Sequence, residues 1–127
     1  MKKHFNKSAL FRKLALAVLV VFAVILAFAF IDFLIHSLSE EYAVPSYYFR
    51  NKIIFGTIIG LITYYIIRKT PLLAKALLFS AIVSVLLQIR YFLEGYPIKF
   101  VVEFLFIHFA ILLPLSLLVF YLFRKRL

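Results

Sequence analysis

The chain has 127 residues, of which 66% are hydrophobic and only 16% charged, and its mean hydropathy is +1.09. Soluble domains usually carry about 45–50% apolar and about 25% charged residues, so this composition excludes a water-soluble globule and a disordered chain. The absence of cysteine excludes a disulfide-stapled secreted module. We therefore expect an all-α integral membrane protein, with residues 1–127 forming a single transmembrane domain.

The first predicted membrane helix covers about residues 14–38. No polar residue interrupts it before Asp32, and about 20 apolar residues are enough to cross a hydrocarbon core of about 30 Å. The segment before it, residues 1–13, is basic, and we expect it to face the cytoplasm and to set the orientation of the chain. Binding to anionic lipids is the alternative role of this basic segment. The same region also fits a signal peptide, because Ala27-Phe28-Ala29 has the small-x-small pattern of a cleavage site. The apolar run continues to Ile35, which favours the membrane helix.

Three further membrane helices are predicted, over about residues 47–69, 72–93 and 97–123. Ser46 is the expected N-cap of the first of these helices, and Pro71 prevents its continuation. Gly95 can take the left-handed conformation that ends a helix, and Pro97 then starts the last one. Pro114 lies inside the last helix, where we expect a kink. The predicted fold is thus a four-helix transmembrane bundle.

Most basic residues fall on one predicted side of the membrane. These eleven are Lys2, Lys3, Lys7, Arg12, Lys13, Arg68, Lys69, Lys75, Arg124, Lys125 and Arg126. The four on the other side are Arg50, Lys52, Arg90 and Lys99. Because cytoplasmic loops carry the excess of Lys and Arg, both termini are expected in the cytoplasm. The net charge of +10 is explained by this pattern, so no nucleic-acid partner is expected.

Tyrosines are expected at the two membrane interfaces, where the ring lies in lipid while the hydroxyl reaches water. The outer set is Tyr42, Tyr47, Tyr48, Tyr91 and Tyr96. The inner set is Tyr64, Tyr65 and Tyr121. No tyrosine is expected in the middle of the membrane.

Small and polar residues predict where the helices pack, because lipid gives apolar helices no hydrophobic reason to associate. Gly56 and Gly60 form a GxxxG motif on the second helix. The third helix has small or polar residues at successive i+4 positions, namely Ala76, Ser80, Ser84 and Gln88. We expect these two faces to meet inside the bundle. The alternative is that one of them forms a homodimer or contacts a larger partner.

Six polar side chains inside the predicted helices form a candidate pocket in the outer leaflet. They are Asp32, His36, Gln88, Arg90, Glu103 and His108. Ionisable groups at the centre of a membrane helix cost about 2.5–3.5 kcal/mol each on insertion scales, so each is a functional candidate. Antiparallel neighbours can bring the six together in a pocket open to the outside. The competing interpretation is a set of interhelical ion pairs, such as Arg90 with Asp32 or with Glu103.

A metal site is one alternative use of these residues, because Asp32 and His36 are four residues apart on one helical face. Glu103 and His108 weaken it. They are five residues apart and point about 140° away from each other on a regular helix. No metal ligand is therefore assigned from the sequence.

Two other uses of the pocket are an anion or lipid-headgroup site and a proton- or ion-coupled pathway. In the first, Arg90 holds phosphate or carboxylate with Lys52 and Lys99 at the rim. In the second, Asp32 or Glu103 titrates. The chain has no Ser-centred elbow, no cysteine nucleophile and only three glycines, so no catalytic residue and no cofactor is expected.

These patterns favour a structural or accessory membrane protein that acts in a homo-oligomer or in a larger membrane complex. A small transporter, or a protein that binds a lipid or an ion in the outer pocket, is the alternative. The expected location is the membrane, and in a prokaryote the plasma membrane.

Overall fold

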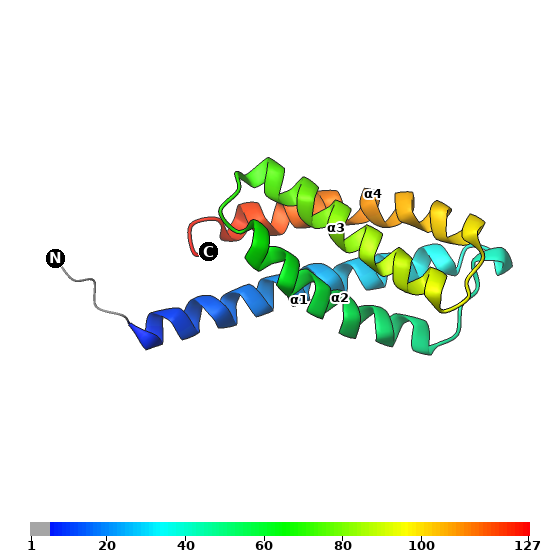
Figure 1. Ribbon diagram of the computed structural model, residues 1–127, viewed down its shortest axis with the longest axis horizontal. Coiled ribbons are helices and arrows are strands. Elements are labelled where there is room, and N and C mark those ends of the chain that lie inside the picture. The colour runs from blue at the N-terminus through cyan, green and yellow to red at the C-terminus, as the bar shows by residue number, and fades with distance from the viewer. Residues whose placement is uncertain (1–5) are drawn as a thin grey trace.

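The computed structural model describes residues 6–127, which form four α-helices and one short 3-10 helix (Figure 1). They are α1 (Lys7–His36), η1 (Glu40–Tyr42), α2 (Tyr47–Ile67), α3 (Leu72–Leu93) and α4 (Ile98–Phe123). No strand occurs in this part of the chain, so the all-α prediction is confirmed. Three helices, α1, α3 and α4, are long and apolar enough to cross a membrane.

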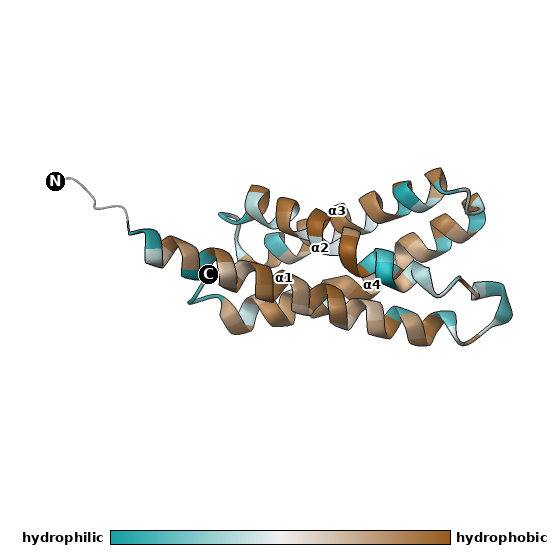
Figure 2. Cartoon of the chain, turned by 90° about the horizontal axis from the view of Figure 1, so that it is seen from below, coloured by the Kyte–Doolittle hydropathy of each residue, from teal (hydrophilic) through white to brown (hydrophobic). Residues whose placement is uncertain are grey.

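The helices form an up-and-down bundle in which each helix packs on two neighbours. α1 contacts α2 and α4, and α3 contacts the same two helices. The α1–α2 and α3–α4 connections lie at one end, and the α2–α3 connection and the C-terminus lie toward the other (Figure 1). Hydrophobic residues dominate the four helices, while hydrophilic residues gather mainly at connections and helix ends (Figure 2).

α1 is longer than predicted at its N-terminal end and projects beyond the bundle there (Figure 1). It begins at Lys7 because the side chain of Asn6 accepts a hydrogen bond from the backbone N–H of Ala9 at 3.1 Å. The part of the predicted basic segment that the structure describes is therefore mostly helical, while Lys2 and Lys3 lie outside the described residues.

The residues expected at the helix ends behave differently from one another. Gly95 has φ +99°, as predicted for a helix-terminating glycine. Ser46 precedes α2, but its backbone is already helical and its side chain caps nothing. Instead, the carbonyl of Pro45 accepts the N–H of Tyr48 at 3.0 Å, so the first turn of α2 starts from Pro45. Pro114 lies inside α4 without ending it.

The polar face of α3 packs on α4, and not on the glycine face of α2 as the sequence indicated. Ser80 and Ser116 form a hydrogen bond between their hydroxyls at 3.1 Å. The Gln88 amide nitrogen donates to the backbone carbonyl of Val101 at 2.7 Å. Ser84, between them, is also fully buried. These contacts place the predicted small-residue face inside the bundle, between α3 and α4.

The glycine face of α2 packs mainly on α1. A Cβ atom added at Gly56 would lie 3.1 Å from Cγ2 of Ile25. One added at Gly60 would lie 2.8 Å from Cγ1 of Val21 and 3.3 Å from Cζ of Phe79. The close approach of α2 to α1, with Phe79 of α3 alongside, therefore requires glycine at position 60.

Gly60→Ala is expected to lower the free energy of unfolding by about 1–3 kcal/mol, because Val21 is β-branched and cannot move away from the new methyl group cheaply. Gly56→Ala is the matched control. Its new methyl group would lie farther from the neighbouring helix, 3.1 Å from Cγ2 of Ile25. Alanine also has a helix propensity about 1 kcal/mol more favourable than that of glycine. Thermal unfolding in detergent, followed by circular dichroism, measures both. Equal stability of Gly60→Ala and wild type would contradict this packing.

Candidate functional site

Four ionisable side chains meet inside the bundle, and we call them the Asp32 cluster. Asp32 and His36 come from α1, Lys52 from α2 and His108 from α4. Asp32, Lys52 and His108 have no exposed surface, and His36 is 4% exposed. Water is therefore excluded from all four groups, which must satisfy one another's charges and hydrogen bonds.

Lys52 occupies the centre of the Asp32 cluster. Its ammonium group donates to the Asp32 carboxylate, to the hydroxyl of Tyr48 at 3.1 Å and to Nε2 of His108 at 3.0 Å. A lysine ammonium has three N–H donors, so each has one acceptor. Aromatic rings surround the same nitrogen, with centroids at 4.3 Å for Tyr48, 5.1 Å for Phe28 and 5.5 Å for Tyr91. Cation–π attraction to these rings adds to the stabilisation of the buried charge.

The two histidines lie on either side of the Asp32 carboxylate. Nε2 of His36 is 3.2 Å from Oδ2, and Nε2 of His108 is 3.2 Å from Oδ1. Nδ1 of His36 donates to the backbone carbonyl of Tyr42 at 2.6 Å, which fixes the proton of a neutral ring on Nδ1. The ring also stacks on Phe104 at 4.2 Å between centroids. η1 and α4 thus close the cluster on the side of His36.

Only three of the six predicted pocket residues come together, namely Asp32, His36 and His108. Arg90 pairs with Glu94 at 2.8 Å and lies over the Phe55 ring, 3.5 Å from its centroid. Glu103 is 37% exposed and pairs with Lys99 at 3.9 Å. It is five residues from His108, so it points to the other side of α4. Gln88 is bonded to the α4 backbone, as described above.

Lys52 is the residue that sequence reasoning misplaced, since it was expected at the rim of an outer pocket. A signal for its position was present, because Lys52, Gly56 and Gly60 follow at i+4 spacing and therefore share one face of α2. Tyr48 continues the same face one turn earlier. Tyr48 and Tyr91, both expected at the interface, are likewise buried, with exposures of 2% and 1%.

Tyr48→Phe is expected to destabilise the protein by about 1–3 kcal/mol, because one buried N–H of Lys52 then has no acceptor. Tyr47→Phe is the matched control: Tyr47 is the adjacent residue and is 51% exposed, so its effect should stay within about 0.5 kcal/mol. Thermal unfolding in detergent compares the two variants. Equal effects would contradict the hydrogen bond between Tyr48 and Lys52.

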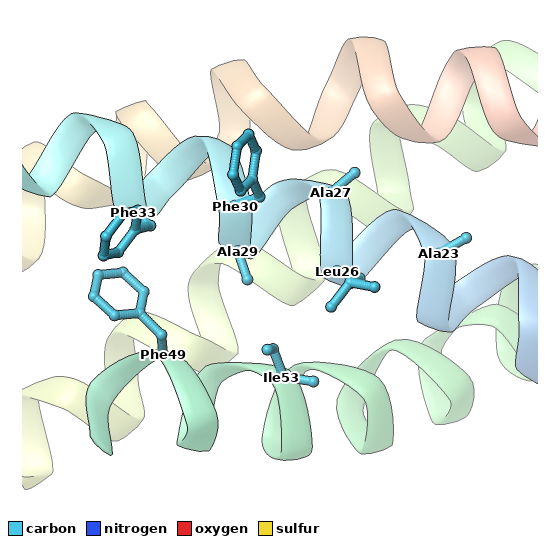
Figure 3. A pocket seen from close by; sticks show the side chains of 8 residues that line it. All are labelled: Ala23, Leu26, Ala27, Ala29, Phe30, Phe33, Phe49 and Ile53. Carbon is cyan, nitrogen blue, oxygen red and sulfur yellow. The ribbon is translucent and has the colours of Figure 1, made fainter. Parts of the chain in front are cut away.

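An apolar groove of about 640 Å³ lies between α1 and α2, separate from the Asp32 cluster (Figure 3). Three alanines of α1 line it with their small side chains, and larger residues of α1 and α2 form the rest of its walls. The alanines are Ala23, Ala27 and Ala29, and the larger residues include Phe30, Phe49 and Ile53. No polar side chain lines it. The groove can take a hydrocarbon chain, but it has no group that orients a polar ligand.

Comparison of the chain with known protein families, with curated proteins and with solved structures finds no match. The chemistry of the Asp32 cluster is therefore what bears on function. The cluster consists of a carboxylate, an ammonium and two imidazoles in a core without water. Such a group can hold the helices in one arrangement as a neutral unit, or it can bind a cation.

Proposed function

We propose that the chain is a small multi-pass membrane protein of structural or accessory type, acting in a homo-oligomer or in a larger membrane complex. The observation that supports this proposal most strongly is the ion pair of Asp32 and Lys52. Its two charges compensate each other, and neither residue has any exposed surface. A site for a transported solute or a lipid headgroup would need a polar cavity large enough for that ligand, and the fully buried, mutually paired side chains of the Asp32 cluster leave none. A sealed, neutral cluster instead favours one fixed arrangement of α1, α2 and α4.

The proposal includes four membrane spans, with α2 as the fourth. Arg50, Asn51 and Lys52 make the start of α2 polar. Pairing of Lys52 with Asp32 removes much of the cost of placing that charge in lipid. At a rise of about 1.5 Å per residue, the 21 residues of α2 are about as long as the hydrocarbon core is thick.

The proposal also places both termini in the cytoplasm and, in a prokaryote, the protein in the plasma membrane. Its support is the excess of Lys and Arg at the bundle end that holds the α2–α3 connection. Lys52 is buried inside the bundle and so does not count as a basic residue of the opposite side. The basic residues that remain on that side are Arg50, Arg90 and Lys99. The asymmetry is larger than the sequence alone indicated.

Cross-linking in native membranes, followed by native mass spectrometry, tests the accessory function. The expected result is a defined assembly heavier than the 14.8 kDa chain. Reconstituted vesicles provide the second arm, in which an imposed pH gradient should decay no faster than in protein-free vesicles. A monomer in native membranes would overturn the proposal. A proton flux that disappears in Asp32→Asn would replace it with the small-transporter alternative.

A further inference from the structure

We propose that Asp32, His36 and His108 form a site for a divalent transition metal of the zinc class, and that Lys52 fills this site when no metal is bound. One ligand atom from each of the three residues lies within 4.8 Å of the other two. Both histidine–carboxylate pairs are at 3.2 Å. Tetrahedral zinc with bonds of about 2.0–2.1 Å places its ligand atoms about 3.4 Å apart, so side-chain rotations can bring these three ligand atoms to that spacing. A water molecule that enters with the ion would take the fourth position.

Unpartnered acceptors point into the same volume. Oδ1 of Asp32 and Nε2 of His36 are buried and have no hydrogen-bond partner among residues 6–127. A neutral His36 ring that donates through Nδ1 presents a lone pair at Nε2, facing a carboxylate oxygen at 3.2 Å. Two acceptors at this distance repel each other unless a cation lies between them. Either a proton on Nε2 or a metal ion supplies such a cation. A proton serves only the contact between His36 and Asp32, whereas a metal ion also engages Nε2 of His108 on the other carboxylate oxygen.

The surroundings of His36 are those of a metal ligand. Metal-binding histidines donate their other ring N–H to a carbonyl or carboxylate, which fixes the tautomer and the ring orientation. His36 makes this bond to the carbonyl of Tyr42 at 2.6 Å. Imidazole nitrogens and a carboxylate oxygen are, moreover, ligands that zinc accepts. η1, which carries Tyr42, therefore orients the outermost ligand.

Lys52 competes with the metal for this site. Its ammonium group contacts the Asp32 carboxylate and lies 3.0 Å from Nε2 of His108. An ammonium and a divalent ion repel strongly at such distances in a dry core, so the metal binds by displacing the ammonium from the carboxylate. Removal of the lysine charge should therefore strengthen metal binding, whereas removal of a histidine should weaken it.

Titration of the full chain in nanodiscs with cobalt(II), followed by visible absorption, tests the proposal. Wild type is expected to bind one ion per chain in a tetrahedral site. His36→Gln and His108→Gln should each weaken binding at least about tenfold, since each removes a ligand. Lys52→Met should tighten binding at least about tenfold. The matched controls Lys99→Met and Glu103→Gln change exposed charges outside the cluster and should bind like wild type.

Wild type and the two histidine variants decide the outcome even if Lys52→Met folds poorly. Absence of saturable binding in wild type would overturn the proposal, and so would binding that both histidine variants retain unchanged. Binding by Lys52→Met alone would also overturn it, since the natural chain would then hold only its own lysine.

Discussion

Asp32→Asn is expected to lower the free energy of unfolding by about 3–5 kcal/mol, because it leaves the charge of Lys52 buried without a counter-charge. Lys52→Met should cost a similar amount, since the Asp32 carboxylate then loses the ammonium that contacts it. The metal-free protein in mixed micelles, unfolded reversibly and followed by circular dichroism, gives both values.

The double variant Asp32→Asn/Lys52→Met should recover most of this loss, because replacement of a buried ion pair by neutral groups is often close to neutral in free energy. The exposed pair of Lys99 and Glu103 is the matched control, and there each single change should cost less than about 1 kcal/mol. Additive losses in the double variant at Asp32 and Lys52 would contradict the description of the two residues as one neutral unit.

Single cysteines are expected to give all-or-none labelling across the membrane. The chain has no cysteine of its own, so Ala43→Cys, Ser8→Cys and Thr70→Cys each introduce a unique thiol. A membrane-impermeant maleimide should label position 43, in the α1–α2 connection, in intact cells. It should label positions 8 and 70 only after permeabilisation, because both lie on the side with the excess of basic residues.

Thr70 reports specifically on α2, since it follows the end of that helix. Labelling of Thr70→Cys and Ala43→Cys from the same side would mean that α2 does not cross the membrane. Labelling of Ser8→Cys but not of Ala43→Cys in intact cells would mean that the protein is inverted. Cell lysates treated with the same reagent control for the reactivity of each thiol.

The elements of this fold that depend on local sequence were predictable. Long apolar runs bounded by Pro and Gly gave the helices close to their observed bounds, as with α3, which ends at Leu93 before Gly95. Asp32 and His36 were recognised as one face because their i,i+4 spacing alone brings them together. Hydropathy does not indicate the early start of α1, because Asn6 caps a helix whose first two turns lie in the basic segment.

The contacts that depend on neighbouring helices were not predictable in the same way. Lys52 lies beside Arg50 in a polar stretch, and its partner Asp32 is on another helix. To assign that pair, one must know which face of α2 is turned toward α1. Lys52 shares a face with Gly56, but the sequence does not show that this face packs on α1. Likewise, Ser80 could be recognised as buried, but its partner Ser116 depends on the order of helices around the bundle.

The contact between Asp32 and Lys52 can be measured directly, because Asp32 is the only aspartate in the chain. The experiment is solid-state NMR of the metal-free protein in lipid bilayers, labelled with ¹³Cγ-aspartate and ¹⁵Nζ-lysine. The dipolar dephasing of the single carbon signal by nitrogen reports the distance between these two atoms. Strong dephasing, for a distance within about 4 Å, is expected in wild type and in Lys99→Met, and should disappear in Lys52→Met. A wild-type signal without dephasing would contradict a bundle closed around a buried ion pair.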